Sequence, residues 1–107
     1  MIYKFKSKAA GDVIMMGPAG DDVLRIVGKS PAQQGILEAA QMPAAITAVE
    51  RAIAADEAAR AEAEKEAAAE GRKLPPRDGV TLRQRAWPLV DMMKRSIVDG
   101  VDIVWGV

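Results

Sequence analysis

The C-terminal segment 81–107 constrains the fold of this chain more than any other part of the sequence. Its first two thirds contain apolar residues at steps of three and four, the spacing that places side chains on one face of a helix. These residues are Leu82, Ala86, Leu89, Met93 and Ile97. An apolar helix face needs a surface to pack against, and we expect that surface to be a small β-sheet.

The ends of this helix carry their own signals. Thr81 followed three residues later by Gln84 is a capping box, and Gly100 can adopt the left-handed conformation that ends a helix. Pro88 removes one backbone hydrogen bond. It should therefore kink the helix or split it, with the main part beginning near Trp87.

Three segments have the sequence signals of β-strands. In segment 2–7, Tyr3 and Phe5 point one way and two lysines the other, whereas 13–16 is a short apolar run that follows turn residues at 9–12. These two strands should form an antiparallel hairpin. Segment 101–105 alternates again, with Trp105 on its apolar face.

These patterns predict an α+β fold with a three-stranded antiparallel sheet, made of the N-terminal hairpin and the C-terminal strand. About three helices should cover one face of this sheet. Trp105 would then lie near Tyr3 and Phe5, and we interpret both Trp87 and Trp105 as core residues.

Two further helices lie between the strands. A helix over 18–27 has Asp21 and Asp22 near its positive N-terminal end, and Gly28 can end it. Segment 30–41 reads as a connector with a brief extended stretch at 36–37. A long helix then runs from Met42 to near Gly71, with an apolar stripe of Met42, Ile46, Val49 and Ile53.

The second half of the long helix is low in complexity. Residues 56–70 are mostly alanine and glutamate, and 71–79 form a Pro-rich loop. The tract is either a solvated helical extension or an antiparallel arm that dimerises through alanines. We predict a single domain over 1–107, with this extension and loop at about 56–79.

The composition excludes several chemistries. The chain contains no cysteine and no histidine, which excludes disulfides, thiolate nucleophiles, imidazole catalysis and zinc sites of the Cys/His type. We expect no cofactor and no metal. The N-terminus lacks the apolar block of a signal peptide, and no window reaches the length of a membrane span. We therefore expect a cytoplasmic protein without a membrane partner.

Three functional hypotheses remain. The first is a small non-enzymatic interaction domain that forms a homodimer through the long helix or an open sheet edge. The second is a small-molecule binding protein or minor enzyme with a pocket between the last helix and the sheet. Its candidate ligand-binding residues are Arg83, Arg85, Trp87 and Trp105. The third is nucleic-acid binding through the basic 72–95 region, although no nucleic-acid motif supports it. The basic residues concerned are Arg72, Lys73, Arg77, Arg83 and Arg85.

The assembled sequence resembles a family of bacterial proteins described as domain of unknown function 1840. The similar segments are M-I-Y-K-F-K-S-K-A-A-G-D-V-I-M-M-G, G-D-D-V-L-R-I-V-G-K, Q-M-P-A-A-I, L-R-Q-R-A-W-P and I-V-W-G-V. The resemblance covers nearly the whole chain except the Ala/Glu tract and the Pro-rich loop. Because the family has no assigned function, it implies no catalytic or binding residue at any position here.

Overall fold

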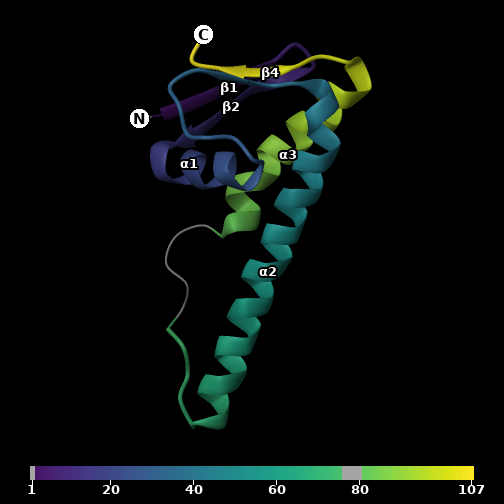
Figure 1. The fold of residues 1–107 in the computed structure, drawn as a ribbon. Helices are drawn as coiled ribbons and strands as arrows, with labels where there is room; N and C mark the ends of the chain where they lie inside the picture. Colours follow the sequence, from purple (N-terminus) through teal and green to yellow (C-terminus); the bar gives the residue numbers. More distant parts are fainter. Residues whose placement is uncertain (1, 76–80) are drawn as a thin grey trace.

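A computed structural model describes residues 2–75 and 81–107 and has an α+β fold (Figure 1). The described elements, in chain order, are β1 (Ile2–Ser7), β2 (Ala10–Met16), α1 (Gly17–Ile26), β3 (Gly35–Leu37), a short 3-10 turn η1 (Ala39–Gln41), α2 (Met42–Ala69), α3 (Leu82–Asp99) and β4 (Ile103–Trp105). The predicted Pro-rich loop lies partly outside the described residues, since these do not include 76–80.

The sheet has four strands in the order β2-β1-β4-β3, and every pair is antiparallel. The predicted hairpin and the placement of the C-terminal strand beside β1 are confirmed, with Phe5 opposite Trp105. The predicted count of three strands is wrong, because Gly35–Leu37 pairs with β4 as a fourth strand. The lack of a side chain at Gly35 leaves room for the Trp105 ring, which occupies the space a Cβ would need.

All three α-helices lie on one side of the sheet (Figure 1). The inward-facing aromatic residues are Tyr3, Phe5 and Trp105, all of which are buried. Phe5 contacts Trp105 edge to face, with ring centroids 5.7 Å apart, and it stacks on Tyr3. The predicted aromatic cluster is therefore confirmed, and it anchors the sheet to the helices.

Helix α3 runs without a break from Leu82 to Asp99 through Pro88. The capping box and the left-handed Gly100 are confirmed, whereas the alternative of a split helix is wrong. The buried face is Ala86, Leu89, Val90, Met92, Met93 and Ser96. Ile97, predicted to be in the core, is exposed instead, because the face that meets the sheet is rotated toward Ser96.

The hairpin turn and the C-terminal strand have different bounds from those predicted. The hairpin turn is Lys8 and Ala9, shorter than the predicted 9–12, because the β2 ladder already begins at Ala10. Strand β4 begins at Ile103 and not at Val101, because the Val101 N–H still bonds the Ser96 carbonyl of α3, 3.0 Å away.

The prediction that Asp21 and Asp22 lie near the positive N-terminal end of α1 is wrong. Because α1 begins at Gly17, Asp21 and Asp22 lie beyond its first turn. Asp21 instead accepts a hydrogen bond from the Tyr3 hydroxyl, and Asp22 pairs with Arg25. Gly28, with φ of 86°, ends the helix as predicted.

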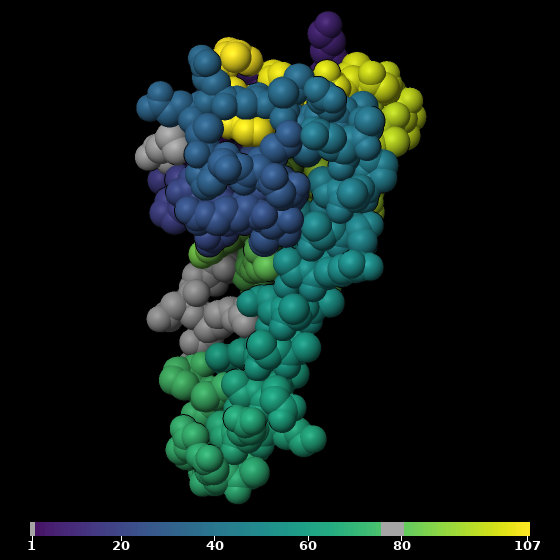
Figure 2. All heavy atoms as spheres, viewed as in Figure 1, coloured from purple at the N-terminus to yellow at the C-terminus, as the bar shows by residue number. Residues whose placement is uncertain are grey.

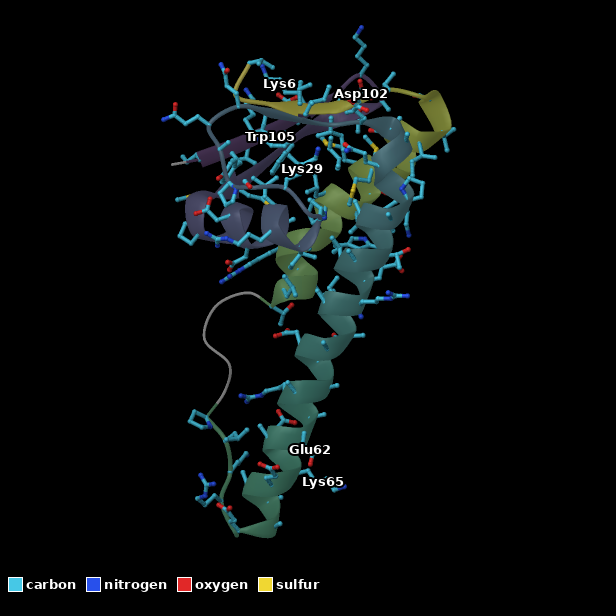
Figure 3. The ribbon with its side chains drawn as sticks, viewed as in Figure 1. Lys6, Lys29, Glu62, Lys65, Asp102 and Trp105 are labelled. Atoms are coloured by element: carbon cyan, nitrogen blue, oxygen red, sulfur yellow. The ribbon has the colours of Figure 1, made fainter. Side chains whose placement is uncertain are left out.

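Helix α2 extends well beyond the sheet and the other helices (Figures 1 and 2). Its buried stripe of Met42, Ile46, Val49 and Ile53 is confirmed. Past Ile53 the only buried residue of this helix is Ala67, over which the chain turns back, with the Arg72 N–H bonded to the Ala67 carbonyl. We call residues 56–75 the arm. Figure 3 shows Glu62 and Lys65 on the arm, far from the sheet.

Candidate functional site

A groove follows the free edge of β2, which ends the sheet on the side away from β3. It has two parts, of about 450 and about 310 Å³, that share Pro88 of α3 in their lining. The first part is lined by Ile14, Met15, Met16, Pro18, Ala19, Gln84, Arg85 and Pro88. The second is lined by Ala10, Gly11, Val13, Pro88, Asp91, Met92 and Arg95. We call this depression the edge groove.

Strand alternation gives the groove an apolar margin. In β2, Met15 faces the core, so its neighbours Ile14 and Met16 face the uncovered side of the sheet, where they are 64% and 65% exposed. Ile2, which pairs with Met16 across the hairpin, is 61% exposed. Antiparallel sheets normally present polar residues on a solvated face. Three adjacent large apolar side chains are thus an unusual surface for this position.

The helical wall of the groove carries charges at both ends. Arg85 lies three residues before Pro88 and Asp91 three residues after it. Asp91 pairs with Arg95 at 3.0 Å across one helical turn. Arg85 forms no ion pair with any residue in 2–75 or 81–107.

Three of the four predicted ligand-binding residues lie on this part of α3. Arg85 lines the edge groove, whereas Arg83 and Trp87 line an adjoining shallow depression of about 370 Å³. Trp105 is buried, and its Nε1–H donates to the Ala32 carbonyl at 3.1 Å. None of the cavities detected between described residues has both Trp87 and Trp105 in its lining.

The prediction that Trp87 is a core residue is wrong, because its side chain is 46% exposed. It follows Ala86, which faces the core, and a step of one residue rotates a side chain about 100° around a helix. The Lys94 ammonium lies 5.2 Å from the centre of the Trp87 ring, a cation–π contact on the surface.

Arg83 is held by the long helix. Its guanidinium donates two hydrogen bonds to the Glu57 carboxylate, at 2.7 and 3.1 Å. Hydrogen bonding to Glu57, and then the attraction between the charges, raises the pKa of Arg83 above its ordinary value. This pair joins the base of the arm to the start of α3.

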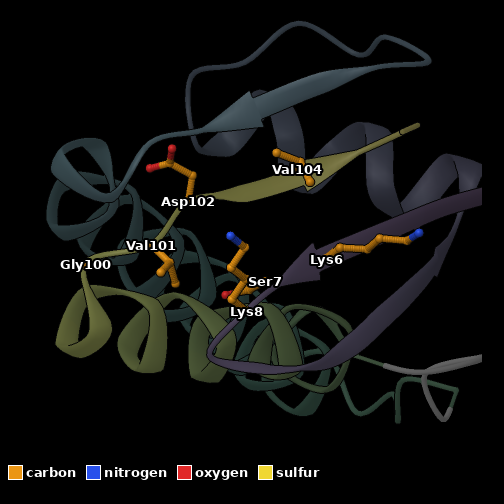
Figure 4. Close-up of a pocket in the computed structure, with 7 residues that line it drawn as sticks. All are labelled: Lys6, Ser7, Lys8, Gly100, Val101, Asp102 and Val104. Carbon is orange, nitrogen blue, oxygen red and sulfur yellow. The ribbon is translucent and has the colours of Figure 1, made fainter.

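A second cavity, of about 530 Å³, opens where β1 and β4 diverge (Figure 4). Its lining is Lys6, Ser7, Lys8, Gly100, Val101, Asp102 and Val104. The ladder between β1 and β4 ends at Lys6 and Val104, so the chain segments beyond this pair separate. The ammonium groups of Lys6 and Lys8 could attract an anion, whereas the negative charge of Asp102 would repel it. The Asp102 carboxylate accepts a hydrogen bond from Ala39 N–H. Sequence reasoning missed this cavity, since nothing local indicates where two strands part.

The ionisable side chains that line the two cavities are lysines, arginines and aspartates. The described residues include no group of three carboxylates that could hold a metal ion. The one tyrosine hydroxyl is bonded to Asp21, and neither residue is in the lining of either cavity. The groove therefore offers an exposed strand edge, apolar side chains and charges at its ends, which are the components of a protein contact.

Fold and groove together define a small α+β domain with one long free sheet edge. The family model for a domain of unknown function, DUF1840, matches residues 1–105, and the chain belongs to this family. No curated protein and no solved structure is significantly similar to the chain. Among the residues that the structure describes, no helix is both long and apolar enough to cross a membrane.

Proposed function

We propose that the protein is a small non-enzymatic interaction domain that self-associates, and that a second copy binds at the free edge of β2. The observation that carries this proposal is the apolar margin of the edge groove. Ile14 and Met16 belong to the edge strand β2, Ile2 lies opposite Met16 on β1, and each of the three is more than 60% exposed. A free edge presents backbone N–H and C=O groups that a further strand can pair with.

The two edges of the sheet differ in what they offer a partner. β2 has seven residues and a groove along its side, whereas β3 has only three. The chain next to β3 is also tied to the C-terminal segment, since the Gln34 amide donates to the Gly106 carbonyl at 3.0 Å. The greater length of β2 and its wider apolar margin both favour the β2 edge as the binding site for a second copy.

The arm provides less surface for association. Beyond Ile53, α2 presents alanine and charged side chains to solvent, and such a surface buries little apolar area. Arg60 of the arm already bonds Glu64 and the Pro75 carbonyl within the same chain. We therefore assign self-association to the sheet edge in preference to the arm.

The other two hypotheses draw less support from the geometry. A pocket that combines arginines with both tryptophans would require Trp105 to be accessible, and it is buried. For nucleic-acid binding, Arg72 pairs with Glu70 and Arg83 with Glu57, which offsets part of the positive charge. Arg77 lies outside the described residues.

The test is the molar mass of the protein in solution, measured by light scattering after size-exclusion chromatography. Ile14→Lys places a charge beside the β2 edge, and the exposed site should tolerate it without loss of folding. Ile36→Lys is the matched control, since Ile36 is an exposed isoleucine on the opposite edge strand. We expect a wild-type dimer, a monomeric Ile14→Lys variant and a dimeric Ile36→Lys variant. A wild-type monomer at every concentration would refute the proposal.

A further inference from the structure

We infer that two copies of the chain pair about a two-fold axis that passes beside Val13 of β2 and Pro88 of α3, with Arg85 of one copy facing Asp91 of the other. This inference rests on the proposed self-association and specifies the contact that produces it.

The symmetry of strand pairing fixes where the axis lies along β2. A two-fold axis at a sheet edge pairs a strand with its own copy in antiparallel orientation. β2 runs from Ala10 to Met16, so an axis beside its central residue, Val13, lets the whole strand pair. The two four-stranded sheets then become one continuous antiparallel sheet, and both free β2 edges are covered.

Helix α3 lies beside the same axis. Pro88 lines both parts of the edge groove, one with Val13 and the other with Ile14, so it lies opposite the middle of β2. The same axis therefore brings the two α3 helices side by side in antiparallel orientation, with Pro88 near the centre.

Two opposite charges on α3 are equally spaced about Pro88. Arg85 and Asp91 are each three residues from Pro88, on opposite sides. Antiparallel pairing of two helices about Pro88 sets Arg85 of each copy level with Asp91 of the other, which gives two opposite-charge contacts in one interface. Arg85 forms no ion pair with the described residues of its own chain. Asp91 bonds Arg95 through one oxygen, and a carboxylate can accept further hydrogen bonds with the other.

The surface is self-complementary in charge, which is why the occupant is a second copy and not an unrelated strand. A neutral peptide added to β2 would leave Arg85 without an opposite charge. A copy of this chain supplies one, Asp91, which has an oxygen left over from its pair with Arg95. The surface also offers apolar contact beside the axis, through the exposed Ile14.

A charge swap tests the inference. Arg85→Asp sets two carboxylates opposite each other, Asp91→Arg sets two guanidinium groups opposite each other, and the double variant restores attraction with reversed sense. Residues six apart on one helix do not face each other, so recovery in the double variant reports a contact between chains. We expect each single variant to raise the dimer dissociation constant about tenfold or more at low salt, and the double variant to return it to within about threefold of wild type.

The dissociation constant is measured by sedimentation velocity over a range of protein concentrations. Circular dichroism of each variant confirms that it is folded, and both substituted positions are exposed. Two results would refute this position of the two-fold axis and leave the proposed self-association standing. One is a dimer that is equally stable in all variants. The other is a dimer that both single variants weaken and the double variant does not restore. A wild-type protein that never dimerises would overturn the proposed function itself.

Discussion

The hydroxyl oxygens of Ser7 and Ser96 lie 2.7 Å apart and join the end of β1 to the buried side of α3. Ser96 donates its own proton to the Met92 carbonyl at 2.7 Å, so Ser7 is the donor in the serine pair. Ser7 in turn accepts from Ala9 N–H in the hairpin turn. The two hydroxyls are thus part of one directed chain of hydrogen bonds from the turn to the helix.

We predict that Ser96→Ala lowers the free energy of unfolding by about 1–2 kcal/mol, because the Ser7 hydroxyl loses its acceptor at a partly buried site. Urea unfolding followed by circular dichroism measures this loss. Ser30→Ala, at an exposed position, is the control and should have no effect. The double variant Ser7→Ala with Ser96→Ala should lose less unfolding free energy than the sum of the losses in the two single variants. Full additivity would show that the hydroxyls act independently.

The single tyrosine gives a direct spectroscopic reading of its surroundings. Burial, and then the hydrogen bond to Asp21, raises the pKa of Tyr3 to about 12. A near-ultraviolet absorbance titration should show this value. Asp21→Asn should lower the pKa, but not to its ordinary value of 10.0, because burial is the larger cause and remains. A wild-type pKa near 10 would contradict this assignment.

The same shift predicts how stability changes in alkali. The folded chain holds the phenolic proton more tightly than the unfolded chain, so this contribution to stability is complete below pH 10 and is lost as the pH rises from 10 toward 12. Tyr3→Phe cannot lose a proton there. The difference in unfolding free energy between wild type and Tyr3→Phe should therefore shrink over this range. If the difference stays constant, the tyrosine does not contribute to the pH dependence.

Two strand glycines should respond oppositely to a methyl group. A Cβ at Gly35 would lie 2.1 Å from Cζ2 of the buried Trp105 ring, so Gly35→Ala should destabilise the fold by about 1–3 kcal/mol. A Cβ at Gly11 would meet nothing within 4 Å, and Gly11→Ala should leave stability unchanged or slightly higher. Thermal unfolding of both variants at one protein concentration measures the contrast. Equal effects would mean that the Trp105 ring does not occupy this space.

The arm should be dispensable for folding and for self-association. Apart from Ala67, every buried core residue in the part of the chain that the structure describes lies before 56 or after 80. Replacement of residues 56–77 with a Gly/Ser linker removes the Arg83–Glu57 pair, and exposed ion pairs contribute little to stability. We expect a folded protein that has nearly the wild-type melting temperature and remains a dimer. A folded monomer would place self-association in the arm.

The elements that the sequence predicts well are those with a sustained period. Tyr3 and Phe5 alternate with lysines, and Met42 to Ile53 recur at helical spacing, so burial follows from the pattern alone. β3 could not be recognised as part of the sheet in this way. Three residues define no period, and the pairing partner is more than sixty residues away in sequence.

The candidate site was predicted only in part, for a related reason. Arg83, Arg85 and Trp87 share a surface because they are close together on one helix. The sequence predicts that Trp105 joins them in a pocket between the last helix and the sheet, yet its buried position beside Phe5 removes it from that surface. The edge groove depends on how β2 lies against α3. That relationship is set by tertiary packing and appears in no local pattern.

The position of β4 between β1 and β3 has a consequence for biosynthesis. The last strand to be made is an inner strand of the sheet, so β3 has no neighbour until residues 103–105 have left the ribosome. The hairpin and the long helix can form earlier, since their contacts are local. Until then, the surfaces of β1 and β3 that β4 will cover are open to other chains. Completion of the sheet therefore has to wait for the synthesis of β4.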